Sequence, residues 1–549
     1  MHTDKIVIQQ LVYRLWKSGL RQVVLSPGSR SAPLVQEFSN YPDIEKHVLF
    51  DERCAGYFAL GLAQQIRKPV AVFCTSGTAV LNLAPAICEA FYQHIPLLIL
   101  TADRPAELIN KGENQAINQV NVFQNYCAAS YNLSEDFTDW ESVNLMSNYA
   151  PVHINLPLRE PLYKTVNELS EKPYLNITIP TSGTLSKQDK KTILEVWKTK
   201  KRKLLICGKD HFQLAKSRYL NLLNGQDDVV LLQEPISNTA IENSVFNIDG
   251  TLASIKDIKL FQPDLVVTIG RQFTSKRLRN FLKQTPDLMH WHISLEGENW
   301  DSFNHEFQVW QCTDVDFLRV VANEKSEVSD WKKKWLSQQQ MVEKNEVDTS
   351  AFVDFSIYQL LSKYIGENTV VQWGNSSPVR YASFFRFAKN TEHFANRGTS
   401  GIDGCVSTAV GCAVANPDKQ VLLVLGDISF FYDSNALFYQ PLPQNLKIIV
   451  VNNSGGNIFR LIDGQTDETM MQQYFETRHN YSVKHIAELF GVKYASNEIG
   501  DTLTKSPTKN EEVLISFLSS KGTTILELKT DGNASAEAYK NYFSSLKSL

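Results

Sequence analysis

Two polar residues that can bind a metal each follow an apolar stretch in the last third of the chain. Asp427 comes after Val421–Leu425, and Asn453, 26 residues later, comes after Ile448–Val451. Strand, helix and strand in this order form a parallel βαβ unit, so we expect both side chains at the carboxyl edge of one sheet. A carboxylate, an amide oxygen and a nearby carbonyl are the hard ligands that Mg²⁺ uses beside a phosphate. Because Asp, Asn and Gly are also common in turns, these residues alone leave a metal–diphosphate site and two ordinary turns equally open.

A glutamate in the first third has the chemistry to share a proton. Glu52 lies directly before a helical pattern whose apolar face includes Ala55 and Phe58. An acidic residue in a first helical turn usually serves the helix dipole. The small apolar residues after Glu52 would place its carboxylate partly within the packing, where it could stay protonated or share a proton with a ring nitrogen near neutral pH.

Three turns of the first third can hold an anion. Ser26–Ser31, Thr75–Thr78 and Thr101–Pro105 each follow an apolar strand, and the first and last of them supply Arg30 and Arg104. Backbone N–H groups at a strand-to-helix junction, together with a guanidinium group, suit an anionic ligand. Each turn is equally explained by a helix cap or a local ion pair, so no single motif decides.

Three further turns lie in the rest of the chain. Gly374–Arg380 and Asn396–Gly404 belong to the last third, and Gly270–Arg277 ends a strand of the middle third. The glycines permit close approach of a ligand to the backbone, and the basic residues suit an acidic group. Each turn also has an explanation as a cap, and for the basic turn of the middle third a solvated turn is favoured.

The elements that must position these residues repeat one theme: a short apolar strand, a polar turn and an amphipathic helix. This alternation predicts an α/β protein with three doubly wound parallel-sheet domains. The polar stretch 157–190 and the charged, Gln-rich run 323–348 predict boundaries that divide the chain into 1–175, 185–345 and 350–549. Strands are expected at Val23–Leu25, Val70–Phe73, Leu97–Leu100, Leu204–Ile206, Val229–Leu232, Leu265–Ile269, Val370–Gln372, Val421–Leu425, Ile448–Val451 and Thr524–Leu526.

The bulk composition predicts a soluble, cytoplasmic protein. The 549 residues are 43% hydrophobic with a net charge of −4, so there is no basic field to attract nucleic acid. No apolar run is long enough for membrane insertion, and the first residues do not read as a signal peptide. The 8 cysteines include no C-x-x-C pair, which favours free thiols in a reducing compartment. The H-E-x-x-H, G-x-S-x-G and Walker motifs are absent from the sequence.

With these residues lined up, the chain resembles the thiamine diphosphate enzymes of the three-domain type, with pyrimidine-binding, central and diphosphate-binding domains. Within them it is most similar to the 2-succinyl-5-enolpyruvyl-6-hydroxy-3-cyclohexene-1-carboxylate (SEPHCHC) synthases of menaquinone biosynthesis. The similarity runs from about Val23 to the last strand and is weakest in the middle domain. Ile428 replaces the second glycine of the general Gly-Asp-Gly motif, and the synthases commonly have an aliphatic residue there. The distinctive pieces are SPGSRSAPL, FDERCAGYFALGLA, TSGTAVLNLAPAICEA, LTADRPAEL, GENQAINQ, TSKRL, GNSSPVR, NRGTSGIDG, GDISFFYDSNAL and VVNNSGGNIF.

The resemblance implies thiamine diphosphate and Mg²⁺ (or Mn²⁺) as cofactors. Asp427, Asn453 and the Gly455 carbonyl would bind the metal. Glu52 of another subunit would hydrogen-bond the pyrimidine ring, and Ile402 would hold the cofactor in a bent shape. The implied cofactor-binding residues are Glu52, Thr78, Gly401, Ile402, Asp427, Ile428, Ser429, Asn453, Ser454, Gly455, Ile458 and Phe459.

The resemblance also implies 2-oxoglutarate and isochorismate as substrates, with decarboxylation of the first and addition of the resulting carbanion to the second. Both are dicarboxylates, which explains the basic residues better than turn chemistry does. The implied assembly is a homodimer or homotetramer with active sites at the subunit interface. The implied substrate-binding residues are Ser29, Arg30, Arg104, Asn114, Gln115, Lys276, Ser376, Arg380 and Arg397, and the implied catalytic residues are Glu52, Gln115, Arg30 and Arg397.

Three other functions stay open on the sequence. An acetolactate-synthase-like carboligase or a decarboxylase would take small apolar acyl groups and leave the arginines unexplained. A nicotinamide-dependent oxidoreductase requires G-x-G-x-x-G, but Gly28 is isolated. A non-catalytic protein with a degenerate cofactor site is disfavoured by the intact Glu52, Asp427 and Asn453.

Overall fold

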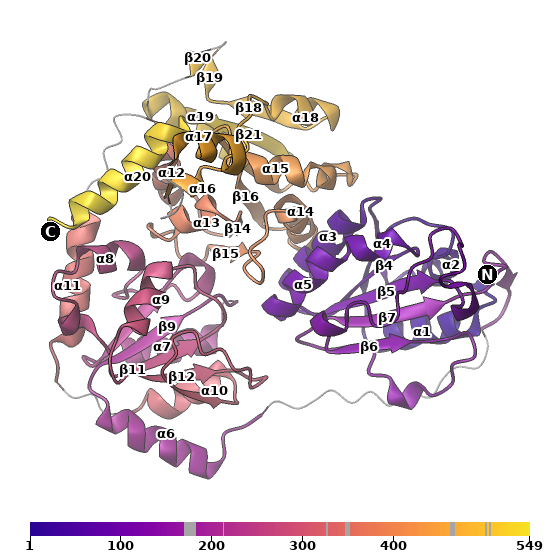
Figure 1. Ribbon diagram of the computed structural model, residues 1–549, viewed down its shortest axis with the longest axis horizontal. Coiled ribbons are helices and arrows are strands. Elements are labelled where there is room, and N and C mark those ends of the chain that lie inside the picture. The colour runs from indigo at the N-terminus through magenta and orange to yellow at the C-terminus, as the bar shows by residue number, and fades with distance from the viewer. Residues whose placement is uncertain are drawn as a thin grey trace.

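The computed structural model describes the chain except residues 170–182, 212, 325–327, 346–351, 462–466, 500–501 and 504–506. Three α/β bodies follow one another along the chain (Figure 1). The predicted α/β class with three parallel sheets is therefore confirmed. The expected domain edges at 175 and 350 lie outside the described residues and stay predictions. No described helix is long and apolar enough to cross a membrane.

The first domain is built on a six-stranded parallel sheet in the order β3-β2-β4-β5-β7-β6. A short antiparallel pair, β1 with β8, joins its two ends. Its strands are β1 (His2–Thr3), β2 (Gln22–Leu25), β3 (Glu45–Val48), β4 (Val70–Cys74), β5 (Leu97–Asp103), β6 (Ala129–Asn132), β7 (Val152–Pro157) and β8 (Thr165–Val166). Its helices are α1 (Ile6–Lys17), α2 (Ala32–Ser39), α3 (Glu52–Ile66), α4 (Thr78–Asn82) and α5 (Ala84–Gln93).

The middle domain has a five-stranded parallel sheet in the order β10-β9-β11-β12-β13. The run 323–348, expected at a boundary, contains a helix whose Trp331 and Trp335 are buried in this domain's core. The strands are β9 (Lys203–Cys207), β10 (Val229–Gln233), β11 (Leu265–Ile269), β12 (Met289–Ile293) and β13 (Glu306–Trp310). The helices are α6 (Lys187–Thr199), α7 (Leu214–Asn224), α8 (Ile248–Ser254), α9 (Lys276–Lys283), α10 (Asp314–Val321) and α11 (Trp331–Lys344).

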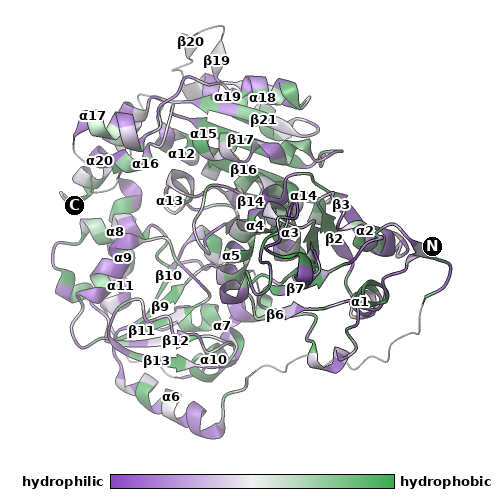
Figure 2. Ribbon diagram, turned by 45° about the vertical axis from the view of Figure 1, so that its right-hand side comes forward, coloured by the Kyte–Doolittle hydropathy of each residue, from purple (hydrophilic) through white to green (hydrophobic). Residues whose placement is uncertain are grey.

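The last domain has a six-stranded parallel sheet in the order β15-β14-β16-β17-β21-β18, and β19 and β20 form a separate hairpin. Figure 2 shows the hydrophobic residues gathered along its central strands, which are buried. The strands are β14 (Thr369–Trp373), β15 (Glu392–Ala395), β16 (Gln420–Gly426), β17 (Leu446–Asn452), β18 (Lys493–Ser496), β19 (Glu498–Ile499), β20 (Thr502–Leu503) and β21 (Thr524–Lys529). The helices are α12 (Asp354–Tyr364), α13 (Ser377–Ala382), α14 (Cys405–Ala415), α15 (Asp427–Tyr432), α16 (Ile458–Leu461), α17 (Glu468–Met470), α18 (Lys484–Leu489), α19 (Pro507–Ser519) and α20 (Gly532–Leu546).

All ten strands expected from the sequence are present, with ends that differ by a few residues. The predicted βαβ unit is also confirmed, because β16 and β17 pair in parallel on either side of α15. Several strands of the sheets were not expected, and most of them are short or contain polar residues. They are β3, β6, β7, β12, β13, β15 and β18.

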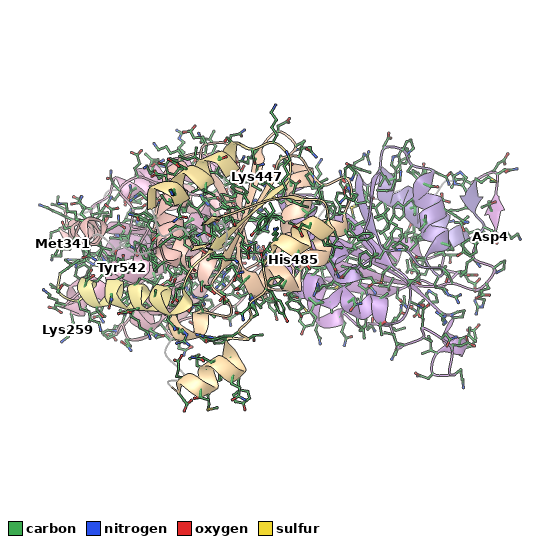
Figure 3. The ribbon with its side chains drawn as sticks, turned by 90° about the horizontal axis from the view of Figure 1, so that it is seen from above. Asp4, Lys259, Met341, Lys447, His485 and Tyr542 are labelled. Carbon is green, nitrogen blue, oxygen red and sulfur yellow. The ribbon has the colours of Figure 1, made fainter. Side chains whose placement is uncertain are left out.

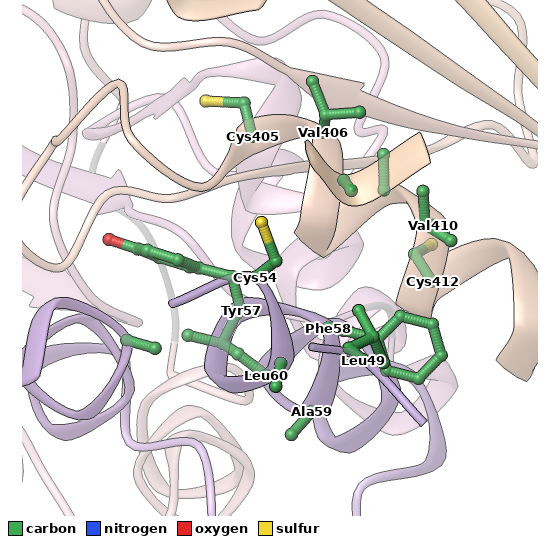
Figure 4. Close-up of a cluster of buried hydrophobic side chains, with 14 of the residues drawn as sticks. Leu49, Cys54, Tyr57, Phe58, Ala59, Leu60, Cys405, Val406, Val410 and Cys412 are labelled. Atoms are coloured by element: carbon green, nitrogen blue, oxygen red, sulfur yellow. The ribbon is translucent and has the colours of Figure 1, made fainter. Parts of the chain in front are cut away.

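The first and last domains share one hydrophobic core, formed where α3 crosses α14 (Figure 4). Two glycines permit the crossing: a Cβ on Gly61 would lie 2.1 Å from the Thr408 carbonyl oxygen, and one on Gly411 would lie 2.1 Å from the Phe58 carbonyl oxygen. Away from this contact the first domain, which carries Asp4, extends from the other two (Figure 3). The N- and C-terminal domains therefore form a packed unit, although the middle domain separates them in sequence.

Candidate active site

A cavity of about 360 Å³ lies at the carboxyl edge of the last sheet, between the ends of β14, β16 and β17. Nine of the predicted site residues line it, and all come from the last domain. They are Ser376, Ile402, Asp427, Ile428, Ser429, Asn453, Gly455, Ile458 and Phe459. Ser454 lines the neighbouring cavity of about 260 Å³ together with Asn453 and Gly455. The edge of a doubly wound sheet is where such folds bind ligands.

Asp427 is fixed in the wall of this cavity at the first turn of α15. Its Oδ1 accepts a hydrogen bond from the Ile428 N–H (2.7 Å), and its Oδ2 accepts one from the Gly455 N–H (2.9 Å). The Nε2 atom of His479 lies 3.1 Å from the same Oδ2. The carboxylate of Asp427 and the turn after β17 are thus held together, as the sequence predicted for two neighbouring strand ends.

Asn453 is held by a buried carboxylate that the sequence analysis missed. Its Nδ2 donates to Asp354 Oδ2 (2.9 Å), while the other oxygen of Asp354 accepts from Thr530 and Ser535. Burial raises the pKa of Asp354, and these hydrogen bonds oppose that rise. With Nδ2 engaged by Asp354, the Oδ1 of Asn453 is the atom that remains to bind a cation.

The loop 396–403 carries Arg397, Gly401 and Ile402, and hydrogen bonds from Asn375 and Ser429 hold it in place. Asn375 Nδ2 donates to the carbonyls of Asn396 and Gly401, both at 2.6 Å. Ser429 Oγ donates to the Ile402 carbonyl (2.8 Å). Ile402 lines this cavity, whereas Gly401, the residue before it, does not.

Glu89, at the middle of α5 in the first domain, holds the same loop from the other side. Its fully buried carboxylate accepts hydrogen bonds from the N–H groups of Gly398 and Thr399, both at 2.7 Å, and from Thr399 Oγ1 (2.6 Å). A Cβ on Gly398 would lie 2.6 Å from the Glu89 carbonyl oxygen, so glycine is required for this approach. A first-domain residue therefore positions the loop that carries Arg397.

Arginines gather beside this loop. Arg397 is buried and donates to Asn375 Oδ1 (3.2 Å), and within the part of the chain that the structure describes its Nε has no hydrogen-bond partner. Burial lowers the pKa of Arg397, and the nearby positive charges of Arg380 and Arg279 add to this effect, whereas Glu234 opposes it. Arg380 donates to the Ser376 carbonyl (2.5 Å). This concentration of positive charge suits a carboxylate ligand.

A second pair of arginines lies at the carboxyl edge of the first sheet. Arg104 donates to Ser76 Oγ (2.6 Å) and to the Gln115 carbonyl (3.3 Å), and no described residue offers its Nε a hydrogen-bond partner. Arg30 donates to the Leu158 carbonyl (2.9 Å) and to a Glu160 carboxylate oxygen (3.3 Å). Burial lowers the pKa of Arg30, and the positive charge of Arg104 contributes, so the two guanidinium groups lie near each other.

The remaining predicted residues of the first two domains do not line the cavity at the edge of the last sheet. Glu52 is half-buried at the start of α3, and its carboxylate accepts a hydrogen bond from Asn82 Nδ2 (3.2 Å). This half-burial agrees with the packing expected for it. Others are at the surface of the single chain: Ser29, Thr78, Asn114, Gln115 and Lys276 are all exposed. Lys276, at the start of α9, has no hydrogen bond or ion pair to another predicted site residue within the described chain.

The donor set fits thiamine diphosphate and a divalent cation. Asp427, Asn453 Oδ1 and the Gly455 carbonyl are hard oxygen ligands on one cavity wall. Apolar side chains supply the rest of that wall and suit an aromatic ring system: Tyr358, Ile402, Ile458, Phe459 and Phe475. Asp354, Asn375 and Glu89 were missed because each acts through a contact with a residue distant in sequence; of the three, only Asn375 lay inside a turn that the sequence singled out.

Three family models match consecutive parts of the chain. They are "Thiamine pyrophosphate enzyme, N-terminal TPP binding domain" over residues 6–122, "Middle domain of thiamine pyrophosphate" over 166–371, and "Thiamine pyrophosphate enzyme, C-terminal TPP binding domain" over 374–528. The fold and the site thus define the class, the thiamine pyrophosphate enzymes.

Similarity to individual proteins identifies the family within this class. The 2-succinyl-5-enolpyruvyl-6-hydroxy-3-cyclohexene-1-carboxylate synthase of Flavobacterium psychrophilum is 35% identical over 99% of both chains, and that of Bacteroides thetaiotaomicron is 35% identical over 100% of both. The synthase of Cytophaga hutchinsonii is 33% identical over 96% of both chains. The chain belongs to this synthase family.

Proposed function

We propose that this protein is a cytoplasmic transferase that releases CO₂ from 2-oxoglutarate and adds the remaining four-carbon unit to isochorismate in a 1,4-addition, giving SEPHCHC for menaquinone biosynthesis. The observation that carries the proposal is full-length similarity to SEPHCHC synthases, combined with a cofactor cavity whose lining residues Ser376 and Asn375 accept hydrogen bonds from Arg380 and Arg397. Both substrates are dicarboxylates, and paired guanidinium groups bind carboxylates with defined orientation.

Asp427, Asn453 and the Gly455 carbonyl are proposed to bind Mg²⁺ or Mn²⁺, which in turn neutralises the cofactor diphosphate. Thr78, Gly401, Ile428, Ser429 and Ser454 are proposed to contact the cofactor beside them. Ile402, Ile458 and Phe459 would pack against its rings and exclude water. Bound thiamine diphosphate supplies a nucleophilic carbon and an electron sink for the loss of CO₂.

The two arginine groups are proposed to divide the substrates between them. Arg30 and Arg104, with Ser29 and Lys276, would bind isochorismate, whereas Ser376, Arg380 and Arg397 would face the succinyl carboxylate. Support comes from the unpartnered Nε atoms of Arg104 and Arg397, which leave a donor for a ligand in each group. Asn114 and Gln115 would orient the substrate or a water molecule, because their loop lies against Arg104.

Glu52 is proposed to hydrogen-bond the cofactor's pyrimidine ring and to hold its proton, from the first domain of a second subunit. In the described chain Glu52 and Thr78 do not line the cofactor cavity. Large apolar side chains are exposed around the start of α3 and near α15, among them Phe50 (49%), Tyr432 (53%) and Phe438 (58%). Such a patch is typical of a subunit interface, so we propose a homodimer or a homotetramer.

The activity is tested with 2-oxoglutarate, isochorismate, thiamine diphosphate and Mg²⁺. Cofactor-dependent release of CO₂ together with loss of isochorismate absorbance is the expected result. Preferential turnover of pyruvate would overturn the proposal in favour of an acetolactate-type carboligase. No turnover of any 2-oxo acid despite tight cofactor binding would indicate a non-catalytic protein.

The shared site is tested by mixing two inactive variants, Glu52→Gln and Asp427→Asn. If each active site combines Glu52 of one subunit with Asp427 of the other, half of the sites in a mixed dimer are intact. Random reassociation should then restore about a quarter of the wild-type activity. Each variant reassociated alone is the control. A mixture as inactive as its components would show that one subunit supplies both residues.

A further inference from the structure

A compact group of ionisable side chains joins the first domain to the middle domain, away from the cofactor cavity. His94 follows the last residue of α5 with φ of 55°, and Glu296 and Glu298 lie in the segment after β12. The Nε2 atom of His94 lies 2.6 Å from Glu298 Oε1, and its Nδ1 lies 3.8 Å from Glu296 Oε1. The two glutamates therefore each direct one carboxylate oxygen toward the imidazole, Glu298 at Nε2 and Glu296 at Nδ1.

Arg271 contacts the opposite oxygens of the same two carboxylates. Its guanidinium nitrogens lie 3.4 Å from Glu296 Oε2 and 3.2 Å from Glu298 Oε2. The four carboxylate oxygens are thus divided, two toward His94 and two toward Arg271. In metal sites, outer partners of this kind orient the ligating carboxylates. Arg271 holds both Oε1 atoms toward the imidazole.

The imidazole is buried without satisfying both of its nitrogens. Only 8% of the His94 side chain is exposed, and its Nδ1 has no hydrogen-bond partner among the described residues. Trp300 covers the group, with its ring 6.3 Å from that of His94 and 6.0 Å from the Arg271 guanidinium. A buried, unpartnered nitrogen beside two carboxylates indicates that a binding partner completes the group.

We propose that His94, Glu296 and Glu298 bind a divalent transition-metal cation, with zinc as the type case. One ligand atom from each residue lies within 4.8 Å of the others, so a small contraction brings all three to metal-bond length. One imidazole nitrogen and two carboxylate oxygens are a ligand set that zinc accepts, whereas Mg²⁺ prefers oxygen alone. The two carboxylates and Arg271 leave one net negative charge to attract the cation.

The bound cation would join the two domains, because His94 belongs to the first and both glutamates to the middle one. An imidazole binds a metal through a nitrogen that carries no proton, as every site of this kind requires. None of these residues lines the cofactor cavity. The proposed metal site is therefore independent of the proposed catalytic activity.

The experiment uses the full-length, untagged protein saturated with thiamine diphosphate and Mg²⁺, so that the Asp427 site is filled. CoCl₂ is titrated in, and its visible absorption and bound stoichiometry are measured before displacement by ZnCl₂. The expected result is one Co²⁺ per chain, displaced by zinc. His94→Gln and Glu298→Gln should weaken binding by about 100-fold or more. His485→Gln is the matched control, because His485 pairs with Glu488 at 3.5 Å but is 81% exposed (Figure 3); it should bind like wild type.

Two outcomes would overturn the proposal. Undiminished Co²⁺ uptake by His94→Gln would place the bound metal elsewhere. Absence of stoichiometric uptake by the wild-type protein would leave the group as an ion-pair network alone, and this result does not depend on whether the variants fold. Circular dichroism of each variant, compared with His485→Gln, separates loss of a ligand from loss of structure.

Discussion

Glu89 offers the sharpest test of how the site is positioned. The substitution Glu89→Gln keeps the size of the side chain but replaces one carboxylate oxygen by an NH₂ group. In the structure, Oε1 accepts from the Gly398 N–H and Oε2 from the Thr399 N–H and hydroxyl. Whichever way the amide is turned, one of these two backbone N–H groups faces a donor instead of an acceptor.

The expected cost follows from that single lost acceptor. A buried N–H left without a partner costs about 1–3 kcal/mol, and losing the charged acceptor weakens the remaining bonds. We therefore expect the docked conformation of the loop to be destabilised by about 2 kcal/mol relative to the undocked one. Its population relative to the undocked loop would then be about 30-fold smaller. Because Arg397 lies in this loop, kcat/KM for the dicarboxylate substrates should fall by up to the same factor.

The assay combines steady-state kinetics with urea unfolding. Glu107→Gln is the control, since Glu107 is an exposed partner of Arg159 and the loss of an exposed ion pair should leave both stability and kinetics nearly unchanged. A Glu89→Gln protein with kcat/KM within about twofold of wild type would refute the positioning role. Loss of stability with unchanged kinetics would show that the contact is structural only.

Two further predictions concern the contact between the first and last domains. Gly411→Ala should destabilise the protein by about 2 kcal/mol or more, because the new Cβ meets the Phe58 carbonyl oxygen at 2.1 Å. Gly366→Ala is the control and should not destabilise it, because a Cβ at Gly366 meets open space. Equal thermal midpoints of the two variants would contradict this reasoning. Burial raises the pKa of Asp433 from 3.8 to about 7, so the folded protein retains a proton that the unfolded chain releases. Asp433 therefore makes a contribution to the free energy of unfolding that falls as pH rises from about 4 to 7 and levels off above, whereas buried neutral histidines such as His153 make the opposite contribution. In urea titrations, the unfolding free energy of wild type minus that of Asp433→Asn should fall by roughly 2–3 kcal/mol between pH 5 and 8, and a difference that does not change with pH would argue against a protonated Asp433.

Most of the strands that the sequence predicted are uninterrupted apolar runs, and the missed strands show what such a pattern cannot detect. In β7, His153 and Asn155 interrupt the run, yet both are buried. Thr101 of β5 satisfies them, with its Oγ1 2.9 Å from His153 Nε2 and 2.8 Å from Asn155 Oδ1. Burial lowers the pKa of His153 to about 4, so the imidazole is neutral at physiological pH.

The same device explains β12, where His290 and His292 both contact Thr268 Oγ1 of β11, at 3.0 and 2.9 Å. A polar residue in a strand becomes acceptable only when a neighbouring strand offers a partner, and the register of that neighbour is not visible in a local pattern. The sequence therefore predicted the sheet centres but not the strands that depend on cross-strand hydrogen bonds.

The site residues also divide into those that the local sequence could predict and those that it could not. The cavity residues of the last domain were predictable because Asp427 and Asn453 end adjacent strands of one βαβ unit. Glu89 was not, since its partners Gly398 and Thr399 lie about 310 residues later and belong to another domain. Nothing near Glu89 in the sequence distinguishes it from an ordinary helical glutamate.

The crossing of α3 and α14 has a consequence for protein synthesis. The apolar face of α3 leaves the ribosome about 340 residues before α14, its partner, has been made. At about 5–20 residues per second, the first domain waits roughly 20–70 s with that face uncovered. During this interval the whole middle domain emerges and can fold. The uncovered apolar face of α3 is then open to aggregation until α14 is made, unless a chaperone binds it.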